Sequence, residues 1–274
     1  MLTLKETQDI ELEIMQKIHL FCEQEKITYC MTYGTLIGAV RHKGFIPWDN
    51  DIDIIMPRPD FDRFLETVKT KSIDDNLVCL HFSNNSKYHY QVIRVCDKRT
   101  VVYPEYIREV PEEMGVWVDI FVADGVPESI FDKPFDQLGL WFNKWVQLSD
   151  IYAIPFRDSP NKSLRGLANN IIKNFIHIIF PNKNNIHEYK VDYFGKRFKY
   201  EEYDHVADTS ERQPPNWLTH EDFDNRVLMP FQQYEFYAPK DYDGYLSRYY
   251  GDYMQLPPEE KRMTHDIKAE WRNE

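Results

Sequence analysis

Apolar residues recur every three or four positions in the first 25 residues of the chain. This spacing places them along one side of an α-helix. Thr3 and Glu6 match a capping box, in which each side chain accepts a hydrogen bond from the other residue's backbone N–H. We therefore expect an amphipathic helix over residues 3–25. Its apolar positions are Ile10, Ile14, Ile18 and Phe21.

Short apolar runs separated by glycine and proline fill the next hundred residues. The predicted strands are 29–33, 51–56, 77–82, 89–96 and 115–122, with a weaker pattern at 100–103. Helices are expected after Gly34, in the segment TLIGAVRH, and after Pro59, with Asp60 as the N-cap of the second. Strands that alternate with helices predict a mixed α/β fold.

Beyond residue 127 the pattern becomes helical and rich in aromatic residues, so we divide the chain into a core at 1–127 and a second part at 128–274. Helices are expected at 135–150 and 163–180. Two interpretations compete for the second helix: it packs its broad apolar face on the core, or it lies in a membrane interface. The cations near it favour the second interpretation; they are Lys162, Arg165, Lys173 and Lys183.

Charge and cysteine content limit the classes of function. The chain has 274 residues with 33 Lys and Arg against 45 Asp and Glu, a formal charge of −12. A surface this acidic argues against nucleic-acid binding. Acidic residues interrupt the N-terminal segment, so no signal peptide is expected. The cysteines lack CxxC spacing, which favours a reduced, cytoplasmic protein that could lie at the inner face of the membrane; they are Cys22, Cys30, Cys79 and Cys96.

Glycine is scarce, yet half of the ten glycines fall in two short segments. Gly34 and Thr35 stand between a predicted strand and a predicted helix, where backbone N–H groups and a hydroxyl can face a phosphate. Gly115 and Gly125 enclose the second segment. Both segments are therefore places where the backbone must approach another group closely.

An acidic pair follows the first glycine segment. Asp51 and Asp53 alternate with Ile52, so both carboxylates face one side of the predicted strand and repel each other. A divalent cation would offset the repulsion, which predicts a Mg²⁺ site. Asn50 falls on the opposite face by the same alternation. The alternative is a solvated turn ahead of an ordinary strand.

Asp119 interrupts the apolar strand of the second glycine segment. A buried carboxylate is costly unless it is paired or bound to a cation. A position facing Asp51 and Asp53 would complete a two-metal phosphoryl-transfer site. The alternative is a buried arginine or backbone donors as its partner. Asp124 precedes a glycine and is expected to be a turn residue.

Three blocks of the sequence resemble the LicD family, which includes bacterial phosphocholine transferases and is related to fukutin-type polyol-phosphate transferases. The blocks are GTLIGAVRHKGFIPWDNDIDIIMPRPDFDRF, GVWVDIFVADGVP and YLSRYYGDYMQLPPEEKRMTH. They occur in order between about residues 29 and 265, and the similarity is weaker between about 135 and 225. The family pattern has an aspartate where this chain has Asn50.

The resemblance implies a nucleotidyltransferase-like mixed sheet with flanking helices and a mostly helical second part that completes the cleft. It implies transfer of a phospho-alcohol, with phosphocholine favoured, from a CDP-linked donor to a hydroxyl of a glycan precursor. The acceptor would belong to a teichoic acid, capsule or lipopolysaccharide, could be lipid-linked, and CMP would leave. Asp51, Asp53 and Asp119 would bind two Mg²⁺ or Mn²⁺ ions, and Asp119 would orient the acceptor proton.

Several cations are candidates for contacts with the donor. Arg41, His42 and Lys43 follow the predicted phosphate turn, whereas Lys98 and Arg99 form a second pair; each set could instead be solvated surface. His265 lies in the third block with an open role. A choline group would favour an aromatic cage. Its candidates are Tyr103, Tyr106, Trp117, Tyr249, Tyr250 and Tyr253.

Two other functions remain open at this point. The first keeps the fold but transfers a nucleotide from a nucleoside triphosphate. The second is a catalytically silent module that binds nucleotide or glycan. The presence of all three carboxylates, Asp51, Asp53 and Asp119, argues against this second function.

Overall fold

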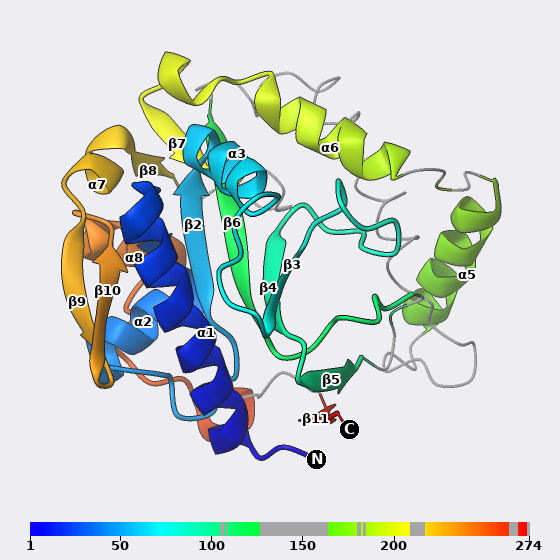
Figure 1. The fold of residues 1–274 in the computed structure, drawn as a ribbon, viewed down its shortest axis with the longest axis horizontal. Helices are drawn as coiled ribbons and strands as arrows, with labels where there is room; N and C mark the ends of the chain where they lie inside the picture. Colours follow the sequence, from blue (N-terminus) through cyan, green and yellow to red (C-terminus); the bar gives the residue numbers. More distant parts are fainter. Residues whose placement is uncertain are drawn as a thin grey trace.

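A mixed β-sheet forms the centre of the protein in a computed structural model (Figure 1). The described residues are 1–104, 107, 109–126, 164–179, 182, 185–208, 217–262 and 268–272. The strand order is β1-β2-β6-β4-β3, and β7 and β8 continue from β6. Among the described strands of this sheet, β2 and β6 run parallel and the other neighbouring pairs are antiparallel. The bounds are β1 Cys30–Met31, β2 Asp53–Pro57, β3 Leu77–Leu80, β4 Ile93–Asp97, β6 Trp117–Gly125, β7 His205–Ala207 and β8 Leu218–Thr219.

The expected N-terminal helix is confirmed as α1, Leu4–Glu25, which crosses one face of the sheet (Figure 1). Thr3 and Glu6 form the predicted capping box, and the four predicted apolar positions are buried. The helix after the first glycine segment, α2, spans Tyr33–His42 and begins two residues earlier than expected. Residues 29–33 therefore supply a strand of only two residues.

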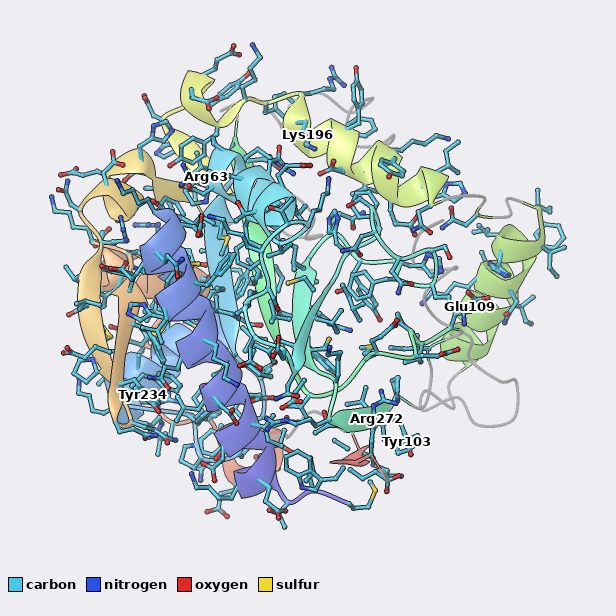
Figure 2. All side chains as sticks on the ribbon, viewed as in Figure 1. Arg63, Tyr103, Glu109, Lys196, Tyr234 and Arg272 are labelled. Atoms are coloured by element: carbon cyan, nitrogen blue, oxygen red, sulfur yellow. The ribbon has the colours of Figure 1, made fainter. Side chains whose placement is uncertain are left out.

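The helix after Pro59, α3, begins at Arg58 and ends at Thr67, with Pro57 as its N-cap. The prediction that Asp60 caps it is wrong, because Pro59 is accommodated inside the first turn, where its missing N–H is not needed. Helix α6, Ile186–Lys196, lies beside α3 at the same edge of the molecule. Lys196 of α6, labelled in Figure 2, forms an ion pair with Asp62 of α3 at 3.6 Å.

Strand β2 begins at Asp53, two residues later than predicted. Ile54, Ile55 and Met56 are all buried, so the expected alternation of buried and exposed positions stops after Asp53. Both faces of β2 are therefore covered, which fits a strand inside the sheet, between β1 and β6.

Segments from the second part of the chain complete the structure around the first. β7 and β8 extend the central sheet, and β11, Lys268–Trp271, pairs with β5, Thr100–Tyr103. β9, Val227–Phe231, and β10, Tyr234–Ala238, form a hairpin that packs near β1 and α2. The other elements are α5 Leu164–Ile179, η1 Tyr200–Glu202, α7 His220–Asp224, α8 Tyr242–Tyr250 and η2 Glu259–Lys261.

The proposed division near residue 127 stays a prediction, and the expected helix at 135–150 lies outside the described residues. The helix expected at 163–180 is present as α5. In the part of the chain that the structure describes, none of the helices combines the length and apolarity needed to cross a bilayer.

Candidate active site

Asp53 and Asp119 are direct neighbours on the two parallel strands at the centre of the sheet. They are register partners on β2 and β6, and Asp51 lies just before β2. The start of β2 is fixed by two hydrogen bonds: the Asp53 N–H donates to Thr35 Oγ1 at 2.7 Å, and the Asp119 N–H donates to Ile52 O at 2.9 Å. The first turn of α2 is thereby held against the acidic pair.

Gly34 and Thr35 lie in the first turn of α2, where the predicted phosphate turn was expected. A Cβ added to Gly34 would lie 2.9 Å from Asp49 Oδ2, so the glycine lets this carboxylate come close to the backbone of α2. A carboxylate close to a helix N-terminus is stabilised by the helix dipole. Asp49 is therefore a further acidic group of this region.

Burial and, after it, mutual repulsion govern the electrostatics of the acidic cluster, which we define as Glu11, Asp49, Asp51, Asp53 and Asp119. Burial, followed by the charge of Asp49, raises the pKa of Asp51 to about 8. Burial and the charges of Asp51 and Asp119 raise the pKa of Asp53 well above its usual value. A cation bound here would relieve both effects, because it would favour the ionised carboxylates.

Glu11 is a member of the cluster that sequence reasoning missed. It lies on α1, is only 3% exposed, and its Oε2 has no hydrogen-bond partner among the described residues. Burial and the charges of Asp51 and Asp49 raise the pKa of Glu11 well above its usual value. A small cavity is lined by Glu11, Asn50 and Trp117 among others. The sequence signal was its position directly after Ile10, at the border of the apolar face of the helix.

Arg94 is the partner of Asp119. This is the buried arginine that sequence analysis gave as the alternative to a bound metal cation at Asp119. The Arg94 Nε donates to Asp119 Oδ1 and the Trp117 Nε1 donates to Asp119 Oδ2, both at 2.9 Å. The guanidinium also stacks on Trp117 and Tyr90, with its central carbon 4.2 Å and 4.4 Å from the ring centroids. Asp119 thus obtains its charge compensation from the protein, and Trp117, a candidate for the choline cage, already faces an internal cation.

Asp124 is not a turn residue, contrary to the sequence-based expectation. It is 2% exposed at the end of β6 and accepts two hydrogen bonds from Arg58, at 2.6 Å from Nε and 2.8 Å from Nη2. Arg58 also pairs with Asp192 of α6 at 2.9 Å. The buried pair therefore joins β6, α3 and α6, and this structural role accounts for an aspartate at position 124.

The candidate cations do not all gather at the acidic cluster. Arg41, His42 and Lys43 lie at the C-terminal end of α2, about 9 Å along the axis from Thr35. The Arg41 Nη1 donates to Tyr253 O at 2.7 Å, and burial lowers the pKa of His42.

The second pair of candidate cations lies after β4. Arg99 is bound by Asp97, and its neighbour Lys98 is exposed. The described residues do not include His265.

Asn50 is buried ahead of β2, so strand alternation does not decide which way its side chain points. Its neighbours in the small cavity include Glu11.

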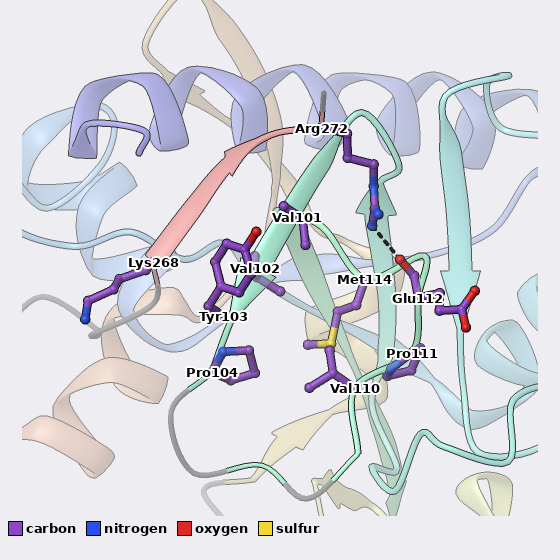
Figure 3. A pocket seen from close by; sticks show the side chains of 10 residues that line it. All are labelled: Val101, Val102, Tyr103, Pro104, Val110, Pro111, Glu112, Met114, Lys268 and Arg272. Carbon is purple, nitrogen blue, oxygen red and sulfur yellow. Dashed lines mark hydrogen bonds between the residues drawn. The ribbon is translucent and has the colours of Figure 1, made fainter. Parts of the chain in front are cut away.

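A larger cavity of about 640 Å³ lies elsewhere, between β5 and residues 110–114 (Figure 3). Its wall is mostly apolar, and Lys268 and Arg272 stand at its border. It contains no member of the acidic cluster, so we do not place the chemistry there. Val102 of β5 lines both cavities, so the two cavities adjoin at this residue.

Comparisons with known proteins agree with this arrangement. The LicD/FKTN/FKRP nucleotidyltransferase domain profile matches residues 26–131, which contain Asp51, Asp53 and Asp119. The lipopolysaccharide cholinephosphotransferase LicD of Haemophilus influenzae is 30% identical over 272 residues, covering 97% of both chains. The chain belongs to the LicD family. Uncharacterised proteins of Rickettsia prowazekii and Rickettsia typhi are each 45% identical over 42 residues, about 15% of this chain.

Membership of the LicD family confirms the resemblance drawn from the three sequence blocks, and the mixed sheet with flanking helices confirms the expected fold class. The roles assigned to individual residues stay predictions. Within the described residues, no three Asp, Glu, His or Cys side chains converge as they would around an ion held by protein ligands alone.

Proposed function

We propose that this LicD protein transfers phosphocholine from CDP-choline to a hydroxyl group of a cell-surface glycan precursor and releases CMP. The observation that carries the proposal is the similarity to a lipopolysaccharide cholinephosphotransferase over nearly the whole chain. The acidic cluster supports it, because transfer of a phosphoryl group needs cations at the site and carboxylates recruit them. The acceptor could be a teichoic acid, capsule or lipopolysaccharide precursor, free or lipid-linked.

Asp51 and Asp53 would hold Mg²⁺. The donor set fits this ion: both groups are oxygen ligands, and burial beside other carboxylates raises the pKa of each. Mg²⁺ commonly takes one or two protein carboxylates together with waters and substrate phosphates, so a complete protein cage is not required. When bound, Mg²⁺ would offset the charge on the phosphoryl oxygens during transfer.

The chain's own residues position the reactants. The first turn of α2 is hydrogen-bonded to the start of β2, so its backbone N–H groups would be available to a diphosphate bound beside Asp51 and Asp53. The acceptor oxygen forms a bond to the choline-bearing phosphorus, and the bond from that phosphorus to the oxygen of CMP breaks. Asp119 keeps lone pairs beyond those used by Arg94 and Trp117, and with one of them it would accept the proton of the acceptor hydroxyl.

Aromatic side chains beside the acidic cluster suit the choline group. Tyr33 packs on Phe121 at 5.1 Å and on Tyr249 at 6.0 Å between ring centroids. Phe121 lies two residues after Asp119, on the same face of β6. The Thr32 Oγ1 and the Tyr245 OH share a hydrogen bond at 2.7 Å, which holds α8 against the start of α2. We propose Tyr33 and Tyr249 as contacts of the quaternary ammonium.

The reaction is proposed to take place in the cytoplasm. All four cysteines are free thiols, which supports a reducing compartment.

The test is a donor screen. We expect the purified protein with Mg²⁺ and a hydroxyl acceptor to release CMP from CDP-choline faster than from CDP-ribitol or CDP-glycerol. Faster CMP release from a polyol donor would show that the protein transfers that polyol phosphate and not phosphocholine. Pyrophosphate release from a nucleoside triphosphate would instead indicate nucleotide transfer, and absence of any product would indicate a binding module.

A further inference from the structure

Helix α5 carries its apolar side chains on the surface. Five large apolar residues of its last nine positions are between 47% and 75% exposed; they are Ile171, Ile172, Phe175, Ile178 and Ile179. At about 100° per residue, all five fall within an arc of about 120°. Lys173, Asn174 and His177 are half-buried on the other side. The helix therefore turns its apolar side away from the protein, the reverse of a helix packed on a core.

The position of α5 agrees with this orientation, since it lies at the outer edge of the molecule, away from the central sheet (Figure 1). Soluble proteins seldom leave a contiguous apolar patch of this kind uncovered. The interpretation that α5 packs this face on the core is therefore wrong for Ile171, Ile172, Phe175 and Ile179, whereas Ile176 is half-buried.

The charges near α5 indicate what kind of surface covers its apolar face. Residues 159–187 contain no Asp or Glu, although 45 of 274 residues are acidic and 29 residues would hold about five. The same segment contains Lys162, Arg165, Lys173 and Lys183. A segment with four cations and no acid is complementary in charge to an anionic surface.

We propose that α5 docks this protein on an anionic lipid bilayer, lying in the plane of the interface with Phe175 and Ile178 inserted among the acyl chains. Amphipathic helices with a cationic border bind such surfaces through buried apolar area and electrostatic attraction together. A twofold contact between copies would bring two segments of the same positive charge together, which disfavours a second copy as the occupant. The docking does not depend on which donor or acceptor the active site uses.

The experiment measures cosedimentation of the full-length protein with vesicles, without donor or acceptor. Vesicles of phosphatidylcholine are compared with vesicles that contain about 30% phosphatidylglycerol, a fraction chosen to give a clearly negative surface. We expect binding to the anionic vesicles at least about tenfold tighter than to the neutral ones, and weaker binding at 0.5 M salt.

A double variant with Phe175→Asp and Ile178→Asp is expected to lose at least about tenfold in affinity for the anionic vesicles. The matched control has Leu20→Asp and Leu228→Asp, two exposed apolar residues outside α5, and makes the same change in net charge. The control should bind within about twofold of wild type. Phe175→Ser with Ile178→Ser adds no charge and should also weaken binding, which separates the apolar contribution from the electrostatic one.

Equal binding of the α5 variants and wild type would overturn the proposal, as would absence of wild-type binding to anionic vesicles. A wild-type dimer in sedimentation velocity that becomes monomeric in the Phe175→Ser Ile178→Ser variant would show that a second copy covers the face instead. Loss of transfer activity with intact vesicle binding would count against the proposed function alone.

Discussion

The Arg94 Nε donates a hydrogen bond to Asp119 Oδ1 at 2.9 Å, from the antiparallel strand β4 that pairs with β6. Both residues are mostly buried, and the aromatic rings of Trp117 and Tyr90 cover the guanidinium. Asp53 lies directly across from Asp119 on the other neighbouring strand. Asp119 therefore has a cation on one side and a carboxylate on the other. We expect substitutions of Asp119 and of Asp53 to change the free energy of unfolding in opposite directions or by different amounts.

The first prediction concerns stability without metal. Asp119→Asn should lower the free energy of unfolding by about 3 kcal/mol, because it leaves the buried charge of Arg94 uncompensated. Asp53→Asn should leave it unchanged or raise it, because it removes a carboxylate that its neighbours repel. Urea unfolding in EDTA measures both. If Asp119→Asn stabilised the metal-free protein, repulsion among the carboxylates would outweigh the ion pair.

The sequence could predict those residues of the site that form local patterns, but not those brought together by contacts between distant segments. The spacing of Asp51 and Asp53 and the isolated Asp119 are local patterns, and they identified three members of the acidic cluster. Arg94 also interrupts a predicted apolar strand, so a lone cation and a lone carboxylate in two buried strands could have been matched. Neither segment's sequence predicts the strand order that makes Arg94 and Asp119 neighbours.

Other features depended on contacts far apart in the sequence. Glu11 reaches the cluster only because α1 packs across the sheet, about 40 residues away along the chain from Asp51. Asp124 looked like a turn residue because glycine follows it, whereas its partner Arg58 lies 66 positions earlier. The amphipathic pattern of α5 predicted the helix correctly, but periodicity alone does not say whether an apolar face points inward or outward.

The second prediction concerns pH. Asp51 binds its proton more tightly in the folded state, where its pKa is raised to about 8, than in the unfolded state. Its contribution to the stability of the metal-free protein is therefore present at acid pH and is lost as pH rises from about 4 to about 8. Wild type should lose more stability than Asp51→Asn between pH 5 and pH 8. The control Asp9→Asn removes an exposed carboxylate and should follow wild type.

Thermal melts in EDTA across this pH range give the comparison. Mg²⁺ should raise the melting temperature more at pH 8 than at pH 6, because binding requires ionised carboxylates. Parallel curves for wild type and Asp51→Asn would show that this carboxyl group titrates alike in the folded and unfolded states.

The third prediction concerns turnover. Asp51→Asn and Asp53→Asn should each reduce CMP release from CDP-choline by about a thousandfold or more, because each removes a ligand of the proposed cation. Both variants should remain folded. Asp9→Asn is the control and should keep wild-type turnover. A cluster variant with more than about a tenth of wild-type activity would be incompatible with a metal ligand at that position.

The fourth prediction concerns selectivity for choline. Tyr249→Leu removes an aromatic face next to Tyr33 while keeping an apolar side chain of similar bulk. A cation–π contact contributes about 0.5 to 2 kcal/mol, so the KM for CDP-choline should rise about 2- to 30-fold. The KM for CDP-glycerol, whose alcohol carries no charge, should stay within about twofold. Steady-state kinetics with both donors measure the difference between them.

Tyr103→Leu is the matched control for this variant. Tyr103 lies on β5, where its hydroxyl donates to Glu270 of β11, and it is exposed away from Tyr33. It was also a candidate for the choline cage by sequence, so the two substitutions compare two candidates with the same chemical change. If Tyr103→Leu raised the KM for CDP-choline and Tyr249→Leu did not, the ammonium group would bind near β5. An equal rise for both donors in Tyr249→Leu would assign Tyr249 to binding of the CDP portion, because only that portion is shared.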